Sequence, residues 1–325
     1  MTDTVADPIV VLPGAAHGLP VEEYVQLLRD RLPDHEIRLA RTSEQQREAI
    51  SDAVIATGGT IDADLVSEAT ELELFACRSA GTESLPMDAL EDQNVVVTNG
   101  SGVYGVQAAE HAVCSMLMFA RRSRYGFRRQ EEREWQHYQA AGELTGSTVT
   151  VLGLGSIGRT IVERLQGFDV HTVGARYTPS KGGPTDEVIG FDRDAVQEAL
   201  SRSDYLAVAC PLTDATEGLI DTAELGALPA SGVLVNVARG GIVDTDALVR
   251  SLRWNQLRGA ALDVIDPEPL DRSHPLWEFE NVIITPHMAG SSPKLWERMA
   301  DLLTTNVERI EETGRFADLE NVVSP

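Results

Sequence analysis

Lysine is almost absent from this 325-residue chain, in which Lys181 and Lys294 stand against many arginines. Acidic residues outnumber basic ones by 51 to 27, and the resulting formal net charge of −24 is spread along the sequence rather than gathered in a tail. Nucleic-acid binding requires a basic face. The charge therefore argues against nucleic acid as a partner.

The same charge predicts a dependence on salt. Like charges repel one another in dilute buffer, and salt screens that repulsion. The pattern is similar to that of proteins from salt-loving microbes with a salty cytoplasm, so we expect a halophilic protein. The alternative is an acidic protein without this adaptation.

Membrane segments and disulfide bonds find no support either. No apolar run approaches the ~20 residues of a membrane span, and the first residues lack the pattern of a signal peptide. These features predict a cytoplasmic protein. The three cysteines, Cys77, Cys114 and Cys210, include no C-x-x-C pair. We interpret them as small core residues and expect no metal site.

The first half alternates short apolar strands with amphipathic helices, which predicts a parallel sheet covered on both faces. The expected strands are residues 9–12, 36–40, 53–57, 72–77 and 95–98, and the expected helices are residues 21–32, 44–52 and 63–70. A helix predicted over 106–122 is apolar nearly all round and should be buried. The arginine-rich segment that follows is interpreted as solvated surface.

A second series begins near Thr148, and its strands are expected at 149–152, 170–174, 205–209, 233–237, 260–264 and 282–285. Six strands is the number found in the doubly wound dinucleotide-binding fold. Pro293 is expected to open a last helix that runs to about Thr313.

The first strand of this series leads into a G-x-G-x-x-G motif, Gly153-Leu154-Gly155-Ser156-Ile157-Gly158, which a helical segment follows. This order predicts a dinucleotide phosphate site. The first glycine permits a tight turn, the second lets the pyrophosphate approach the backbone, and the third lets the helix pack closely on the strand. Unpaired N–H groups at the helix start would bind the anion. A glycine-rich turn without a ligand is the alternative.

The residue at the end of the next strand indicates which cofactor binds. In NAD sites an Asp or Glu about 20 residues beyond the glycines binds the ribose 2′-hydroxyl, and Arg176 holds that place here. A guanidinium attracts the 2′-phosphate of NADP, which a carboxylate would repel. Tyr177, Thr178, Ser180 and Lys181 could add donors. We predict a preference for NADPH, with a surface arginine as the alternative.

Three further segments each follow a predicted strand, where parallel sheets bind ligands. They contain Arg239, then Asp263 with Glu268, then His287. An arginine can hold a carboxylate in a fork, and a histidine beside a carboxylate can act as an acid near neutral pH. These groups suit hydride transfer from NADPH to a 2-keto acid, with the histidine protonating the ketone oxygen and the arginine polarising the carbonyl.

The chain resembles the D-isomer-specific 2-hydroxyacid dehydrogenases over nearly its whole length. The motifs that carry the resemblance are Val237-Ala238-Arg239-Gly240-Gly241 with Val243-Asp244, Ala261-Leu262-Asp263-Val264 with Glu268-Pro269, the run from Asn281 to Gly290, and Ala109-Glu110-His111. It implies that Arg239 binds the substrate carboxylate and carbonyl, that His287 is the general acid/base, and that Glu268 is its partner.

The resemblance also implies further site residues and a D-hydroxy acid product. Asp263 would hold the nicotinamide carboxamide, and backbone N–H groups of Ser79, Ala80 and Gly81 would bind the substrate carboxylate. Tyr104 is expected near the substrate tail. The cofactor would also be lined by the segment Cys210-Pro211-Leu212-Thr213 with Thr216 and by Val237, Ala238 and Ala289, together with Arg239 and His287.

By the same resemblance the fold is α/β with two doubly wound domains. A Rossmann cofactor domain over 100–287 is expected to be inserted in a flavodoxin-like substrate domain made of 1–99 and 288–325. The family usually forms dimers through the cofactor domains, and the helix at 106–122 with the arm after it is the expected contact. Arg176 departs from the acidic residue usual in the family, which puts NAD use in doubt. Glu268 disfavours formate dehydrogenase, which has a glutamine as the partner of its histidine.

Two functions of different classes remain open. One is an NADPH-dependent 2-ketoacid reductase, of which a glyoxylate/hydroxypyruvate reductase is a particular case. The other is a cofactor-sensing scaffold like the transcriptional corepressors related to this family, although the acidic charge disfavours a DNA-linked role. His111 is expected to cap or pack a helix, and the histidines other than His111 and His287 are expected on the surface.

Overall fold

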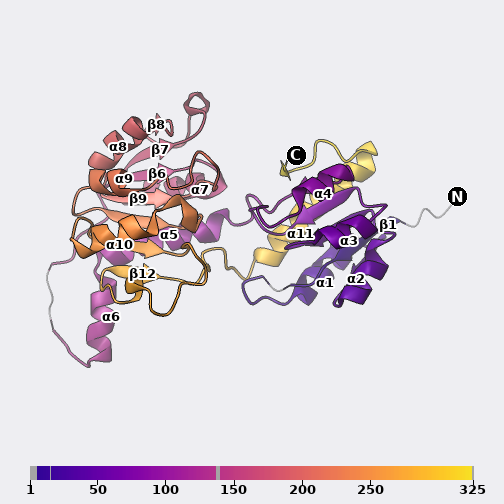
Figure 1. The fold of residues 1–325 in the computed structure, drawn as a ribbon, viewed down its shortest axis with the longest axis horizontal. Coiled ribbons are helices and arrows are strands. Elements are labelled where there is room, and N and C mark those ends of the chain that lie inside the picture. The colour runs from indigo at the N-terminus through magenta and orange to yellow at the C-terminus, as the bar shows by residue number, and fades with distance from the viewer. Residues whose placement is uncertain (1–5, 15, 137–139, 324–325) are drawn as a thin grey trace. The chain divides into compact units, whose positions relative to one another are not determined.

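The structure is a computed structural model that describes all residues except 1–5, 15, 137–139 and 324–325. The chain forms two compact units. Unit 1 is Met1–Tyr104 with Ser291–Pro325, and unit 2 is Gly105–Gly290. Each unit is built on a sheet with helices on its faces (Figure 1).

Unit 1 contains a six-stranded sheet in the order β13-β5-β4-β3-β1-β2, parallel except for β13, which runs antiparallel to β5. Its strands are β1 (Ala6–Val11), β2 (His35–Leu39), β3 (Ile55–Gly58), β4 (Leu74–Cys77), β5 (Val96–Thr98) and β13 (Val322–Val323), and its helices are α1 (Val21–Arg31), α2 (Ser43–Ile50), α3 (Ala63–Glu68), α4 (Met87–Asp92) and α11 (Leu295–Thr313). The order of the five parallel strands is that of the flavodoxin-like sheet, so this expectation is confirmed.

Alternation along the strands covers both faces of this sheet, because successive side chains point to opposite sides. Ile9 and Val11 of β1 pack with Tyr24 of α1 and Trp296 of α11. Val10 belongs to the core cluster on the other face, with residues of α2, α3 and α4. The helix expected to open at Pro293 begins at Leu295 instead.

Unit 2 contains a parallel sheet of seven strands in the order β12-β11-β10-β9-β6-β7-β8. Its strands are β6 (Thr148–Leu152), β7 (His171–Ala175), β8 (Glu187–Ile189), β9 (Tyr205–Val208), β10 (Val233–Asn236), β11 (Gly259–Leu262) and β12 (Val282–Ile284), and its helices are α5 (Gly105–Ala120), α6 (Ser123–Glu131), α7 (Ser156–Leu165), α8 (Arg193–Ser201), α9 (Thr222–Ala227) and α10 (Thr245–Arg253). The order from β8 to β11 is that of the doubly wound dinucleotide-binding fold, with β12 added at one edge.

The expected number of six strands in this sheet is wrong, because β8 was not recognised. It has only three residues, all half-buried, and it pairs with β7 alone. The carboxylate of Asp186, just before β8, accepts hydrogen bonds from the Thr172 backbone N–H at 2.7 Å and from its hydroxyl at 2.8 Å. These contacts stabilise an edge strand that has little hydrophobic signal of its own.

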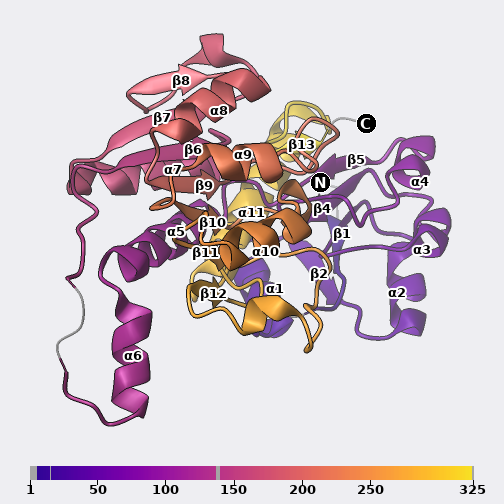
Figure 2. The same ribbon diagram turned by 60° about the vertical axis from the view of Figure 1, so that its left-hand side comes forward.

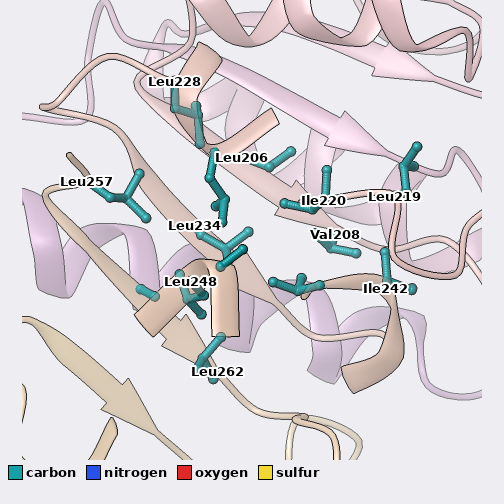
Figure 3. Close-up of a cluster of buried hydrophobic side chains, with 14 of the residues drawn as sticks. Leu206, Val208, Leu219, Ile220, Leu228, Leu234, Ile242, Leu248, Leu257 and Leu262 are labelled. Carbon is teal, nitrogen blue, oxygen red and sulfur yellow. The ribbon is translucent and has the colours of Figure 1, made fainter. Parts of the chain in front are cut away.

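Two hydrophobic clusters cover the faces of the unit 2 sheet. On one face Leu206 and Val208 of β9, Leu234 of β10, Leu262 of β11 and Leu248 of α10 pack together (Figure 3). The alternate residues of β9 and β10 pack on the other face with α5 and α7. Truncating one such buried leucine typically costs about 2–5 kcal/mol. The strand ends that carry the site loops are therefore firmly held.

Helix α5 is largely buried, with ten of its 16 residues in the core. Cys114 of this helix is nevertheless exposed, so the interpretation of all three cysteines as core residues is wrong for this one; Cys77 and Cys210 are buried. Helix α6 has no buried residue. It extends away from the sheet of its unit in both ribbon views (Figures 1 and 2).

Candidate active site

The glycine motif forms a tight connection between β6 and α7. Gly153 has a φ of +98°, and a Cβ there would lie 2.6 Å from Cys210 Cα. A Cβ on Gly158 would lie 1.8 Å from the Gly153 carbonyl oxygen, so helix and strand approach as closely as a side-chain-free residue permits. Gly155, at the start of α7, faces open space. Backbone N–H groups of the first helical turn are therefore accessible to an anion.

A cavity of about 790 Å³ adjoins this motif. It is formed by loops that follow β6, β7 and β9, at the carboxyl ends of three neighbouring strands. The lining residues are Gly153, Leu154, Gly155, Arg176, Tyr177, Thr178, Lys181, Phe191, Cys210, Pro211, Thr213, Asp214, Ala215 and Thr216. Eleven of the residues that the sequence indicated for the cofactor site thus meet around one cavity, and Phe191, Asp214 and Ala215 were not recognised in the sequence. A small-residue cradle beside a helix start suits a dinucleotide.

Arg176 is held at the mouth of this cavity between β7 and the short helical turn Pro179–Lys181. Its backbone N–H donates to the Ile189 carbonyl of β8 at 3.0 Å, and its guanidinium donates to the Gly182 carbonyl. The exposed Lys181 lines the same cavity. The two cations therefore gather where β7 ends.

The loop after β9 contributes neutral groups. Thr216 Oγ donates to the Pro211 carbonyl at 2.6 Å and accepts from the Thr213 N–H at 2.8 Å, which closes the turn. Burial raises the pKa of the Cys210 thiol to about 12. The thiol stays protonated at neutral pH and adds no negative charge beside a diphosphate.

His287 and Glu268 form a pair, with 2.8 Å between His287 Nδ1 and Glu268 Oε2. The other carboxylate oxygen accepts from the Ile265 N–H at 3.1 Å, which orients the carboxylate. Because an ionised carboxylate only accepts, Nδ1 carries a hydrogen and Nε2 is left for another partner. The two side chains are 50 % and 38 % exposed. The imidazole is thus oriented and still accessible.

Asp263 organises the turn that carries His287, which has a left-handed φ of +49°. Its carboxylate, 1 % exposed, accepts from the N–H groups of Met288 at 2.9 Å and Ala289 at 2.8 Å. Its carbonyl accepts from the His287 N–H at 2.8 Å. In the structure the carboxylate predicted to hold the nicotinamide carboxamide binds the protein's own backbone.

Arg239 follows β10 in a loop that the Asn236 side chain braces. The Asn236 amide donates to the Arg239 carbonyl at 2.9 Å, and its oxygen accepts from the Ala238 N–H at 3.1 Å. A Cβ on Gly240 would lie 2.1 Å from the Ile265 carbonyl carbon. The loop that carries Arg239 therefore contacts the loop that leads to Glu268. Val237 and Ala238, predicted to line the cofactor, are buried at the same strand end.

Ser79, Ala80 and Gly81, whose backbone N–H groups are predicted to bind the substrate carboxylate, lie in unit 1, just after β4. The Ser79 carbonyl accepts from the Gly100 N–H, and the Ala80 carbonyl from the Asn99 amide, both at 2.8 Å. Tyr104 donates its hydroxyl to the Arg78 carbonyl at 2.6 Å, and burial raises the pKa of that hydroxyl to about 12. The Ser79 and Ala80 carbonyls are thus engaged by residues 99–100.

Arg78, which is only 4 % exposed, was not singled out from the sequence as a residue near the substrate loop. Its guanidinium donates to the Leu12 and Pro13 carbonyls at 3.1 Å each and lies over the Tyr24 and Trp296 rings. Burial lowers its pKa. An arginine directly after the apolar strand Leu74–Cys77 was the available signal. Trp296 is a core residue.

Several histidines have partners that the sequence did not indicate. His111 lies 3.2 Å from Thr285 Oγ, and His35 pairs with Glu311 at 2.9 Å while its side chain is largely buried. The expectation that His35 lies on the surface is wrong. His171 pairs with Glu187 at 2.9 Å, and His137 lies outside the described residues.

Among the residues that the structure describes, no group of three or more His, Cys, Asp or Glu is placed to hold a metal ion. In the same residues no helix is long and apolar enough to span a membrane.

The chain belongs to the D-isomer specific 2-hydroxyacid dehydrogenase family, whose NAD binding domain model matches residues 113–289. The glyoxylate reductase of Aeropyrum pernix is 33 % identical over 255 residues, which make up 76 % of each protein. The D-3-phosphoglycerate dehydrogenase of Methanocaldococcus jannaschii is 28 % identical over 94 % of this chain, but the match spans only 58 % of that protein.

Among solved structures, a D-isomer specific 2-hydroxyacid dehydrogenase from Xanthobacter autotrophicus in complex with NADPH and MES is similar, with a TM-score of 0.84 and 27 % identity. The match covers 98 % of this chain and 99 % of that one. Fold and family therefore agree with the Rossmann assignment of unit 2.

Proposed function

We propose that this protein transfers hydride from NADPH to a small 2-keto acid and yields a D-2-hydroxy acid, in a reversible reaction. The observation that carries the proposal is the oriented pair of His287 and Glu268, which lie 2.8 Å apart. Their loops adjoin the Arg239 loop, and all of them belong to the unit that contains the dinucleotide motif. The family and the named reductase among its relatives support it.

NADPH, when bound, supplies the hydride; the protein's residues bind, orient and move a proton. His287 Nε2 protonates the ketone oxygen, and Glu268 keeps the imidazole oriented. Arg239 binds the carboxylate in a fork and polarises the carbonyl. Unit 2 is the proposed cofactor domain and unit 1 the substrate domain, whose Ser79, Ala80 and Gly81 N–H groups bind the substrate carboxylate.

The test is a spectrophotometric assay of NADPH oxidation, followed at 340 nm. The substrates are glyoxylate, hydroxypyruvate, pyruvate, 3-phosphohydroxypyruvate and longer 2-keto acids. Each is assayed in about 1 M KCl, which screens the surface charge. Turnover with one of them supports the proposal. The glyoxylate reductase relative makes glyoxylate and hydroxypyruvate the first candidates. Turnover with none of them would favour a cofactor-sensing scaffold instead.

The proposed preference for NADPH rests on Arg176 and Lys181, which line one cavity where β7 ends, whereas Asp214 of the same cavity lies in the loop after β9. Replacing Arg176 by Asp should shift the ratio of kcat/KM for NADPH over NADH by about tenfold or more toward NADH, since hydrogen bonds to charged groups are worth about 1.5–3 kcal/mol. Steady-state kinetics with both cofactors measures it. Arg253→Asp makes the same charge change at the end of α10, outside the cavity, and should leave the ratio alone. An unchanged ratio in Arg176→Asp would remove the assignment.

We also propose a halophilic, cytoplasmic homodimer that associates through α5 and α6. Helix α6 has no buried residue, and it exposes Tyr125 and Phe127. The net charge of −24 opposes both folding and association. At about 1 M KCl, where the Debye length is about 3 Å, we expect a folded dimer by light scattering and circular dichroism. In dilute buffer we expect monomers and unfolding. A protein that stays a folded monomer at every salt concentration would contradict both the halophilic character and the dimer.

A further inference from the structure

Helix α5 contacts the segment that carries the proposed acid at two points. His111 Nε2 lies 3.2 Å from Thr285 Oγ, and Gln107, one turn earlier, donates its amide to the Gly290 carbonyl at 3.1 Å. The two contacts lie at the beginning and the end of the run Thr285–Gly290, which contains His287. All of these residues belong to unit 2.

The direction of the hydrogen bonds in this network follows from the donors available. Thr285 has one hydroxyl hydrogen, and its oxygen lies 2.6 Å from Asp263 Oδ1. A buried carboxylate only accepts, so Thr285 donates to Asp263. The Thr285 oxygen must then accept from His111, and Nε2 of His111 carries a hydrogen. The chain of donors runs from His111 through Thr285 to Asp263.

The carboxylate at the end of this chain holds the turn of His287. Asp263 accepts from the Met288 and Ala289 N–H groups, and its carbonyl accepts from the His287 N–H. A non-glycine residue with φ of +49° is held there by its surroundings, because a left-handed backbone costs roughly 1–2 kcal/mol. The orientation of the His287 imidazole thus depends on where Asp263 sits.

A packing role alone does not account for His111. The side chain is 22 % exposed, on a helix whose neighbouring buried positions Ala108 and Ala112 are apolar. Nε2 lies 3.2 Å from the hydroxyl that bonds Asp263 and 3.9 Å from Asp263 Oδ1 itself. The imidazole therefore orients a buried carboxylate that is already fully engaged with the turn.

We propose that His111 is a positioning residue for the acid/base His287, acting through Thr285 and Asp263. The inference rests on the proposed function of His287. Removing a hydrogen-bond partner that orients a metal-ligating side chain typically costs about 10–100-fold, and we expect the same scale for a partner that orients the acid/base here. Loss of the Nε2 donor should let the turn at 285–289 relax and misplace the imidazole.

The experiment compares three variants on one helix. His111→Leu removes the donor, and His111→Gln keeps one that can reach Thr285. Glu110→Gln is the control, since Glu110 is exposed and pairs with Arg164 at 3.8 Å. We expect kcat to fall about tenfold or more in His111→Leu, with the NADPH dissociation constant and Tm near wild type. We expect His111→Gln to regain most of the loss and Glu110→Gln to lose nothing.

A second readout needs no turnover. In protein labelled with ¹⁵N-histidine and free of cofactor, His111 should show hydrogen on Nε2 at neutral pH, and the His287 ring signals should shift in His111→Leu but not in Glu110→Gln. Hydrogen on Nδ1 alone, unshifted His287 signals, or wild-type kcat in His111→Leu would each overturn the proposal. A wild-type protein that turns over no 2-keto acid would refute the proposed function, while the NMR measurement would still test the hydrogen-bond chain.

Discussion

His287→Ala should lower turnover by about 10²–10⁴-fold, the usual contribution of general acid–base catalysis. The imidazole is the group that the structure leaves half-exposed while Glu268 orients it at 2.8 Å, so its loss removes the proton donor without disturbing the core. The NADPH dissociation constant, measured by the fluorescence of the bound cofactor, should change little.

The chain offers a matched control for this variant. His171 also pairs with a glutamate, Glu187, at 2.9 Å, but it stands at the start of β7, the opposite end from the cofactor loops. His171→Ala removes an imidazole from a His–Glu pair of the same unit and should keep wild-type turnover. Equal turnover in His287→Ala and wild type, in a protein that melts at the wild-type temperature, would rule out the acid/base role.

The parts of the fold that could be predicted are those whose residues carry their own signal. The strands near the glycine motif are continuous apolar runs such as residues 149–152, and their order of appearance with the helices predicts a parallel sheet. The site loops follow from the same logic, because polar residues such as Arg239 and His287 come directly after buried strands.

The parts that could not be predicted depend on contacts between residues distant in sequence. Strand β8 is three half-buried residues that Asp186 links to Thr172, and three residues are too few to show a period. Strand β13 has two residues and exists only because it pairs with β5. Such elements are defined by their partners, which a single sequence does not reveal.

The same reason explains what was missed at the site. His111 looks like a lone histidine on an apolar helix, and its partner Thr285 is 174 residues away. Asp263 was linked to the cofactor through the resemblance, and that role stays a prediction; the bonds of its carboxylate to Thr285 and to the backbone of Met288 and Ala289 were not foreseen. The motifs indicate which residues matter; the hydrogen bonds show what those residues hold in place.

Arg239→Lys should lower kcat/KM for the keto acid by about 10²–10³-fold, the scale for losing one preorganised donor to a developing oxyanion. A lysine keeps the charge but not the planar fork that binds a carboxylate and a carbonyl together. The backbone around the site should survive the change, because the Asn236 side chain binds the Arg239 carbonyl and the Ala238 N–H, although the guanidinium also donates to the Ala238 carbonyl at 2.8 Å.

Steady-state kinetics on the best keto acid, with NADPH saturating, measures the effect. Arg250→Lys is the control: Arg250 lies on α10 of the same unit, and its guanidinium bonds the Thr222 hydroxyl at 3.3 Å. That variant should keep the wild-type kcat/KM. If Arg239→Lys also keeps it, the substrate carboxylate is held elsewhere, and the backbone N–H groups of Ser79, Ala80 and Gly81 become the sole proposed anchor. A further variant, Arg239→Ala, separates direction from charge, because a fork contributes through both. If added guanidinium ion restores its activity and ammonium ion does not, planarity is the property that the site requires.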